Sequence, residues 1–261
     1  MLLKLNKDRM HLIDQRIYFF VLGFFLGMDE IDVVQVTRQT NQGMTTPYIC
    51  KGDDQKGYVV KGCKATRRGL VNEWVVAYLA RAFGLPIPNF KKAYVDDALL
   101  AIGYELYNYN FASEFQPSIQ DVRYSQLENI SPKLLKDLYI FDYWVKNNDR
   151  CLTQNGGNPN FFLHQGTNEP FVIDHNLSFD ESFCVEKHRD LHVGTSVWYG
   201  LDLVDKQHYE HRFSEALNVF DSAMLSMPDE WFELESKDSI RSKIEVVLRE
   251  YEHDSFWEAL R

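Results

Sequence analysis

The spacing of apolar residues changes near the middle of the chain, from short β-type runs to longer runs with helical period. Short runs rich in Val, Ile, Tyr and Thr, bounded by turn residues, predict strands. Turns are indicated by Asn41-Gln42-Gly43 and by residues 53–57, which contain Asp and Gly. The predicted strands cover residues 31–39, 46–51, 58–61 and two further segments within 91–104, on either side of Asp96-Asp97.

One helix is predicted among these strands. Apolar residues recur at helical spacing from Leu70 to Phe83. Gly84, followed by Pro86, ends the periodicity, and both residue types are typical of the end of a helix. The pattern therefore predicts a helix over residues 70–83.

The second half of the chain is predicted to be mainly helical. Ser131-Pro132 indicates a helix start, because serine caps free backbone amides and proline fits the first helical position. The apolar stripe that follows keeps helical period to about Lys146. The other elements expected here are a loop at 147–158, strands at 161–163 and 171–173, and helices at 212–227 and 239–251.

The order of these elements predicts an α+β fold with two lobes. Residues 107–130 are aromatic and polar without clear periodicity, and we expect the lobe boundary there. The prediction is a small strand-rich N-terminal lobe at 31–110 and a larger helical C-terminal lobe at 111–261. Such a layout suits a nucleotide-binding cleft.

The apolar run from Ile17 to Met28 precedes this predicted domain. It covers about 12 residues, whereas a membrane-spanning helix needs roughly 20. Basic residues precede the run, as in a signal peptide, but no small-residue cleavage site follows, and Asp29 and Glu30 come at once. We expect residues 1–30 to be a peripheral N-terminal extension, without a membrane span.

Composition and charge narrow the function classes. The chain has 45% hydrophobic and 25% charged residues, which is typical of a folded globular protein. A net charge of −10 disfavours a surface that neutralises nucleic-acid phosphates, so a nucleic-acid partner is not expected. The four cysteines form no CxxC pair, which favours a reducing, cytoplasmic location.

The polar residues that follow the predicted strands are those that phosphoryl transfer requires. That reaction needs a lysine on the nucleotide phosphates, oxygen ligands for magnesium and a carboxylate that accepts the hydroxyl proton. Lys61 ends a predicted strand, and Glu73 lies on the following helix, where the two side chains could pair. Without this neighbour, Lys61 would be interpreted as a solvated lysine.

The second part of this pattern lies after the predicted helix at 132–146. Asn148-Asp149-Arg150 follows the helix, Asn160 opens a short strand and Asp174 closes another. Carboxylate and amide oxygens are ligands that magnesium prefers. An isolated Asn-Asp-Arg is usually a solvated loop, and only the order and spacing of the whole set indicate a site.

These segments resemble the HipA-like kinase family, a bacterial branch of the protein-kinase-like fold. The resemblance covers roughly residues 31–180. It rests on Gln39-Thr40-Asn41-Gln42-Gly43, Tyr58-Val59-Val60-Lys61, Leu70-Val71-Asn72-Glu73-Trp74, Gly84-Leu85-Pro86-Ile87-Pro88, Phe141-Asp142-Tyr143-Trp144, Asn148-Asp149-Arg150, Asn158-Pro159-Asn160-Phe161 and Ile173-Asp174-His175-Asn176.

The resemblance implies an ATP- and Mg²⁺-dependent kinase with specific residue roles. Lys61 and Glu73 would form the ion pair, Asp149 would be the base, and Asn160 and Asp174 would bind Mg²⁺. The segment Gly43-Met44-Thr45-Thr46 would cover the phosphates, with Gly43, Thr45, Thr46 and Lys61 contacting the nucleotide. This segment has one glycine where the family has a glycine-rich loop, so it offers fewer permissive backbone positions.

Two other departures from the family concern efficiency. Asn176 stands where related sequences often have glycine, and residues 151–157 lengthen the catalytic loop. The sequence leaves open whether Thr45 or Thr46 is autophosphorylated. It also leaves the acceptor and any regulatory protein partner unidentified.

Alternative interpretations remain at this point. A small-molecule kinase would share the same phosphoryl-transfer residues, and a nucleotide-binding regulatory pseudoenzyme is disfavoured because the set is complete. Cys184, His188 and His192 are spaced for one helix face, but a fourth zinc ligand is missing. His175 is expected to be structural, because Asp149 already fills the base position. Four aromatic residues are expected in the core: Trp198, Tyr199, Trp231 and Trp257.

Overall fold

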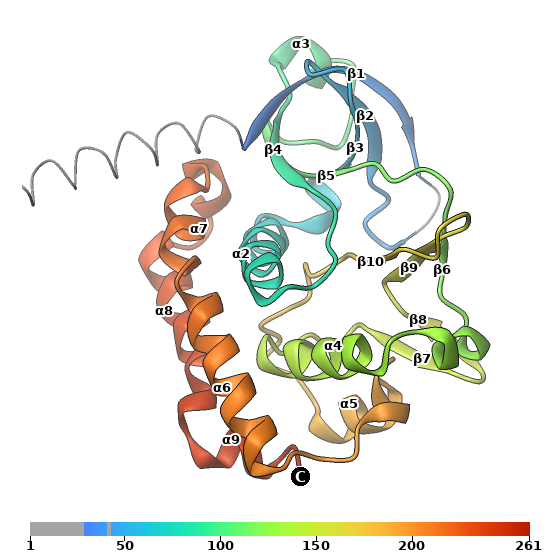
Figure 1. Cartoon of the computed structure of the whole chain (residues 1–261). Coiled ribbons are helices and arrows are strands. Elements are labelled where there is room, and N and C mark those ends of the chain that lie inside the picture. The colour runs from blue at the N-terminus through green and yellow to red at the C-terminus, as the bar shows by residue number, and fades with distance from the viewer. Residues whose placement is uncertain (1–28, 41–42) are drawn as a thin grey trace, which may run out of the picture.

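The computed structural model describes residues 29–40 and 43–261 (Figure 1). The predicted peripheral extension, apart from Asp29 and Glu30, lies outside the described residues, as does the Asn41-Gln42 part of the first predicted turn. No helix of the described part is long and apolar enough to cross a membrane.

The first part of the chain forms a closed five-stranded barrel. Its strands are β1 (Glu30–Gln39), β2 (Tyr48–Gly52), β3 (Gly57–Lys61), β4 (Phe90–Tyr94) and β5 (Tyr109–Glu114). Their order is β1-β2-β3-β5-β4, and a parallel pairing of β1 with β4 closes the barrel. Alternate residues of β1 and β3, such as Ile31, Val33, Tyr58 and Val60, are buried in its core. The three predicted strands at 31–39, 46–51 and 58–61 are confirmed.

The predicted pair of strands within 91–104 is wrong in its second member. After β4 the chain forms the short helix α3 (Asp97–Leu100), because the Asp96 side chain accepts a hydrogen bond from the Leu99 amide. Asp96 is therefore a helix N-cap rather than a turn residue. The partner strand of β4 is β5, which lies in the stretch 107–130 where we saw no periodicity.

The predicted helix at 70–83 is confirmed as α2 (Arg67–Phe83). It begins three residues early, because the Thr66 hydroxyl accepts a hydrogen bond from the Gly69 amide. It ends at Gly84, whose φ of 91° lies in the left-handed region that favours glycine. The Trp74 indole donates to Ser226 far along the chain, so α2 is anchored to the C-terminal helices.

The middle of the chain carries the segments that follow the barrel. Helix α4 (Pro132–Trp144) confirms the predicted start at Ser131-Pro132. Strands β9 (Phe161–His164) and β10 (Pro170–Val172) confirm the predicted strands, and they form a three-stranded sheet with β6 (Ile119–Asp121). The 3₁₀ segments η1 (Cys63–Ala65) and η2 (Tyr124–Asn129) follow β3 and β6.

The loop predicted at 147–158 contains a β-hairpin. Strands β7 (Cys151–Thr153) and β8 (Gly156–Asn158) pair antiparallel. The Thr153 hydroxyl bonds to the Gly156 carbonyl across the turn, and Gly156 adopts a φ of 98°. The polar, glycine-rich composition gave no strand signal, because strand propensity reflects packing more than backbone preference.

The last third is helical, as expected, but its divisions differ. It contains α5 (Val185–Leu191), η3 (Thr195–Val197), α6 (Leu203–Leu217), α7 (Phe220–Ser226), η4 (Asp229–Phe232), α8 (Lys237–Leu248), η5 (Glu250–Glu252) and α9 (Asp254–Glu258). The single helix predicted at 212–227 is two helices. The Asp202 side chain caps α6 much earlier, and the helix stops before Val219.

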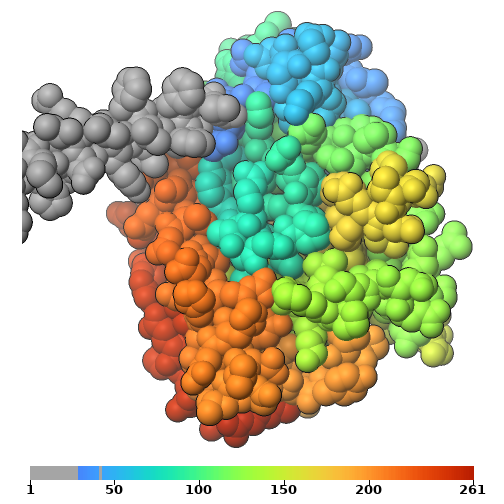
Figure 2. All heavy atoms as spheres, viewed as in Figure 1, coloured from blue at the N-terminus to red at the C-terminus, as the bar shows by residue number. Residues whose placement is uncertain are grey.

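The barrel lies at one end of the molecule with α2 next to it, and the helices α6 to α9 run along one side, past α2 and α4 (Figures 1 and 2). The barrel has its own core, and a larger core joins α2 to α4, α6, α7 and α8. Trp231 and Trp257 are buried and Trp198 is partly buried, as predicted. Tyr199 is 87% exposed, so its assignment to the core is wrong.

Candidate active site

Lys61 lies at the end of β3 and contacts two carboxylates. Its Nζ atom donates to Glu73 Oε2 at 2.9 Å and to Asp174 Oδ1 at 2.6 Å. Only 7% of Lys61 is exposed, so it is a buried lysine with two partners. Burial lowers the pKa of Lys61, but Asp174 and Glu73 more than reverse this, so the net pKa is raised and the side chain stays charged.

Glu73 and Asp174 are tied together through the same lysine and through the backbone. Glu73 is buried on α2, and its Oε2 atom also accepts from the His175 amide at 3.0 Å. Burial alone would raise the pKa of Asp174, but the contact with Lys61 lowers it, so this carboxylate is ionised at neutral pH. The structure thus brings together the predicted Lys61–Glu73 pair and the predicted metal-binding aspartate.

Asp149 and Asn160 form a second contact pair. Asp149 follows α4, and its Oδ2 atom accepts from Asn160 Nδ2 at 3.1 Å and from Asn158 Nδ2 at 2.9 Å. Since the Asn160 amide nitrogen is used in this contact, its amide oxygen is left to act as a ligand. The predicted base and the predicted amide ligand are therefore neighbours.

Both candidate metal ligands adopt left-handed backbone conformations. The φ angle is 43° at Asn160 and 64° at Asp174. Asn and Asp tolerate this region better than most residues, but the conformation still costs free energy and is concentrated at functional sites. Two such residues in one candidate site indicate a geometry that the surrounding contacts maintain.

Arg150 contacts both segments that carry the predicted metal ligands, Asn160 and Asp174. Its guanidinium is 1% exposed and its Nη1 atom donates to the backbone carbonyls of Asn160 and of Ile173, which directly precedes Asp174. Its Nη2 atom lies 3.0 Å from His175 Nε2. Since arginine only donates, this histidine nitrogen accepts. One side chain therefore holds the backbone at both predicted metal ligands.

Asp142 balances the charge of Arg150. Its Oδ2 atom accepts from Arg150 Nε at 2.6 Å and contacts His192 Nε2 at 2.9 Å, and its Oδ1 atom accepts from Asn147. Burial would raise the pKa of Asp142, but Arg150 and His192 hold it well below its ordinary value. This fully buried carboxylate on α4 explains how a buried arginine is tolerated.

His175 has the surroundings of a structural residue. Burial, with Arg150 alongside, lowers the pKa of His175 to about 3, so it is neutral at physiological pH. Its amide donates to Glu73 and its ring faces Arg150. The expectation that it supports the neighbouring aspartate is consistent with these contacts.

The segment from Gly43 to Thr46 lies at the Lys61 end of β3, because Tyr48 of β2 pairs with Val60. Gly43 has a φ of 78° and its carbonyl accepts from the Thr46 amide. The Thr46 hydroxyl accepts from Lys64 Nζ at 3.0 Å, and within the described residues no hydrogen bond links Thr45 or Thr46 to Lys61. The strand register therefore places the segment that contains Gly43, Thr45 and Thr46 near the Lys61 end of β3, and Lys64 is hydrogen-bonded to this segment.

Sequence reasoning missed several residues that the structure adds to the site. Arg150, Asp142, Asn158 and Lys64 were given no role. One signal was available for Asp142, which lies in an otherwise apolar and aromatic helical stripe and would need a partner if buried. For Arg150 the sequence offers no sign of burial.

Cys184, His188 and His192, which the sequence spaced like zinc ligands, engage other groups. His192 contacts Asp142, and His188 Nε2 lies 3.1 Å from the Tyr139 carbonyl oxygen. Burial lowers the pKa of both histidines. Among residues 29–40 and 43–261, no group of three or more His, Cys, Asp or Glu side chains is arranged to hold a metal ion.

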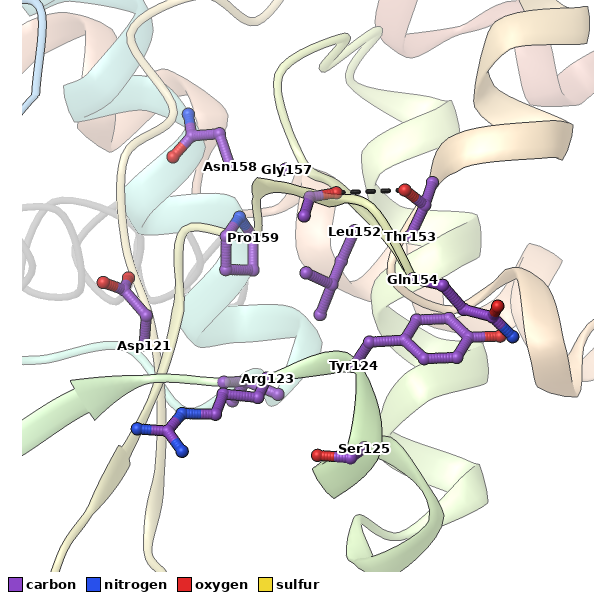
Figure 3. A pocket seen from close by; sticks show the side chains of 12 residues that line it. Asp121, Arg123, Tyr124, Ser125, Leu152, Thr153, Gln154, Gly157, Asn158 and Pro159 are labelled. Carbon is purple, nitrogen blue, oxygen red and sulfur yellow. Dashed lines mark hydrogen bonds between the residues drawn. The ribbon is translucent and has the colours of Figure 1, made fainter.

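A groove of about 610 Å³ adjoins the Asp149 contact (Figure 3). It lies between the β7–β8 hairpin and residues 121–125. Asn158, which donates to Asp149, is one of its lining residues. The groove therefore opens beside the candidate base.

Comparisons with known proteins found a matching family model and similar solved structures. A crystal structure of a Helicobacter pylori proinflammatory kinase, CtkA, is similar with a TM-score of 0.53 and 10% identity, over 84% of this chain and 92% of that chain. The FAT and kinase domain of CtTel1 aligns with a TM-score of 0.31 and 14% identity, over 83% of this chain and 21% of that chain. No curated protein matches the sequence. The family model for HipA-like kinases matches residues 33–260, and the chain therefore belongs to the HipA-like kinase family.

Proposed function

We propose that this chain is an ATP- and magnesium-dependent phosphotransferase, a serine/threonine protein kinase of HipA-like type. One observation carries the proposal. The side chain of Lys61 contacts both Glu73 and Asp174, while Asn160 contacts Asp149, and Arg150 binds the backbone at both groups. Residues far apart in the sequence thus lie in contact, and they are of the types that phosphoryl transfer uses, which supports the proposal.

In this proposal the strand-rich barrel and the helical part act as two lobes, with the nucleotide between them. Strand β5 extends to Glu114, so we place the division after this residue instead of at 110. Lys61 would hold nucleotide phosphates, and Glu73 would orient Lys61. Gly43, Thr45 and Thr46 would contact the phosphates from the β1–β2 turn, with Lys64 adding positive charge.

The ligand set fits magnesium. Mg²⁺ is usually held by one or two carboxylates together with substrate phosphates and water, instead of by a cage of protein ligands. Asp174 and the Asn160 amide oxygen would supply the protein part, which accounts for the lack of a larger acidic cluster in the described chain. Magnesium would neutralise the developing charge on the phosphates.

Asp149 would accept the proton of the acceptor hydroxyl. As the hydroxyl oxygen forms its bond to the γ-phosphorus, the bond between that phosphorus and the ADP oxygen breaks, and the proton passes to Asp149. The hydrogen bonds from Asn158 and Asn160 keep the Asp149 carboxylate oriented. A positioned carboxylate contributes typically 10²- to 10⁴-fold to such a transfer, as an order of magnitude.

The test of this function is transfer of labelled γ-phosphate from Mg-ATP, in the presence of a cell lysate, by the full chain and by Asp149→Asn. We expect labelled acceptors with the wild type and none with the variant. Equal labelling by both proteins would contradict the proposal. We also propose a cytoplasmic location, since all four cysteines are free thiols.

A further inference from the structure

The groove between the β7–β8 hairpin and residues 121–125 has no role in the chemistry described so far (Figure 3). Its floor contains the buried residues Val122, Leu152 and Pro159. Exposed polar side chains, among them Asp121 and Asn158, form the rim. The hairpin that makes one wall is the insertion that lengthens the catalytic loop.

The groove reaches the candidate base through Asn158. The Asn158 amide donates to Asp149, so one residue of the groove is bonded directly to the candidate proton acceptor. Asp121 pairs with Phe162 in the β6–β9 ladder, two residues beyond Asn160. Both walls are therefore built on the segments that position Asp149 and Asn160.

The groove offers a free strand edge to an extended chain. Within the described residues, β8 pairs only with β7, and its residues Gly156, Gly157 and Asn158 are exposed. A free edge presents backbone donors and acceptors that an extended polypeptide can pair with. Gly156 has open space where a side chain would stand, so nothing from this residue blocks the edge.

Asp121 places a negatively charged side chain at the rim of the groove. In the described part of the chain, the Asp121 side chain forms no hydrogen bond and no ion pair. The residue as a whole is exposed, but partial desolvation of its carboxyl group raises its pKa. Figure 3 shows the Asp121 carboxylate and the Arg123 guanidinium on the same side of the view, with the carboxylate nearer to Asn158 and the guanidinium farther from it. A positively charged side chain beside Asp121 would give its carboxylate an ion-pair partner. The net charge of −10 would attract basic segments at long range.

We propose that this groove binds the acceptor polypeptide in an extended conformation and that Asp121 selects a basic residue near the hydroxyl that receives the phosphate. The inference rests on the proposed phosphotransferase function and adds the location of the acceptor and its charge preference. It makes Asp121 a specificity residue outside the nucleotide site.

The experiment uses the full chain, Mg-ATP and synthetic serine or threonine peptides that carry Lys, Ala or Glu at each flanking position. The readout is the ratio of transfer rates on Lys and Ala peptides, measured for wild type, Asp121→Asn, Asp121→Lys and the control Asp238→Asn, which removes an exposed carboxylate on α8, outside the groove. A ratio within one protein is insensitive to the folded fraction. We expect wild type to favour Lys about fivefold at one position, the size of a partly exposed ion pair.

Asp121→Asn should bring this ratio close to one, and Asp121→Lys should favour Glu at the same position, while Asp238→Asn keeps the Lys preference. A wild type without a Lys preference, or an Asp121→Lys variant that keeps it, would overturn the proposal. If wild type labels no peptide but still binds and turns over Mg-ATP, the groove assignment fails and the phosphotransferase function stands. Loss of Mg-ATP binding and turnover would instead contradict the function itself.

Discussion

Asn160 and Asp174 have unfavourable left-handed backbones, and Arg150 bonds to the carbonyl at or just before each of them. The order of residues along the chain and the family resemblance led to the prediction that both bind Mg²⁺. The sequence did not identify Arg150 as their support, because a single arginine in a polar loop carries no signal of burial. Residues that touch the reactants can be predicted from chemistry, whereas those that hold them depend on tertiary contacts.

Arg150→Lys should therefore weaken magnesium binding and transfer. Lysine keeps a positive charge near Asp142 but cannot form the planar set of contacts to the carbonyls and His175. We expect the Mg²⁺ concentration for half-maximal transfer to rise by about 10- to 100-fold, the usual effect of losing support behind a metal ligand.

The matched control is Arg212→Lys, which alters an arginine bound to Asp137 and the Phe83 carbonyl. This variant should lose stability without a change in Mg²⁺ dependence. Both quantities can be measured by magnesium titration of the transfer rate and by urea unfolding. An Arg150→Lys protein that loses only stability would show that Arg150 does not position the ligands.

Only 7% of Lys61 is exposed, so we expect its replacement to lower the stability of the fold as well as the transfer rate. In Lys61→Met the buried Glu73 loses the lysine that lowers its pKa, while burial and Asp174 still raise it. A group whose folded pKa is raised stabilises the fold at low pH and loses that contribution as pH rises. We expect a deficit of about 3 kcal/mol in unfolding free energy at pH 8 that is smaller at pH 5.5.

Urea unfolding at the two pH values measures this difference. Lys56→Met serves as the control, because Lys56 pairs with Glu114 at an exposed position and should show little pH dependence. A pH-independent deficit in Lys61→Met would contradict the assignment of a buried, unpaired Glu73. Glu73→Gln should show a weaker loss of transfer than Lys61→Met, because Lys61 keeps its charge.

At the scale of elements, capped and strongly periodic segments could be predicted and weakly patterned ones could not. Helices α2 and α4 carried both an apolar stripe and an end signal. The β7–β8 hairpin has neither signal. Its turn contains glycine, the residues of β8 are exposed, and only the middle residue of β7 is buried. Helix α3 was mistaken for a strand because Asp96 can begin a turn or cap a helix, and only its bond to Leu99 decides between them.

Gly157→Ala tests whether the hairpin positions Asn158 and the acceptor groove. A Cβ atom at Gly157 would lie 2.4 Å from the Cys151 carbonyl oxygen of the paired strand, so the hairpin must distort. We expect transfer to fall by about 100-fold, because an ångström-scale displacement near the reacting atoms has such an effect. Mg-ATP binding should be retained.

Gly103→Ala is the matched control. Gly103 has a φ of 100° and Gly157 one of 155°, both in the region that favours glycine, but a Cβ atom at Gly103 would meet nothing within 4 Å. This variant should show the backbone cost alone, with normal transfer. Equal transfer by Gly157→Ala and Gly103→Ala would mean that the hairpin does not contribute to the site.

At the scale of the whole molecule, α2 links the barrel to the C-terminal helices while carrying Glu73. Trp74 on this helix packs against Phe90 and Phe111 of the barrel and against Trp231. The order of strands and helices predicted the α+β class and the helical C-terminal part. It could not predict that β1 and β4 pair and close the barrel, because the residue pattern of the two strands does not indicate which strands become neighbours.

The central claim is that Asp149 and Asp174 have different tasks in one site. A thermal-shift titration with Mg-ATP, combined with a transfer assay, measures this on wild type, Asp149→Asn and Asp174→Asn. A ligand at 100 times its dissociation constant stabilises the fold by about 2.7 kcal/mol. Asp149→Asn should keep the wild-type shift while transfer falls by orders of magnitude, and Asp174→Asn should lose most of both. Exchanged behaviour of the two variants would reverse the assigned roles, and wild-type transfer by both would contradict the kinase mechanism.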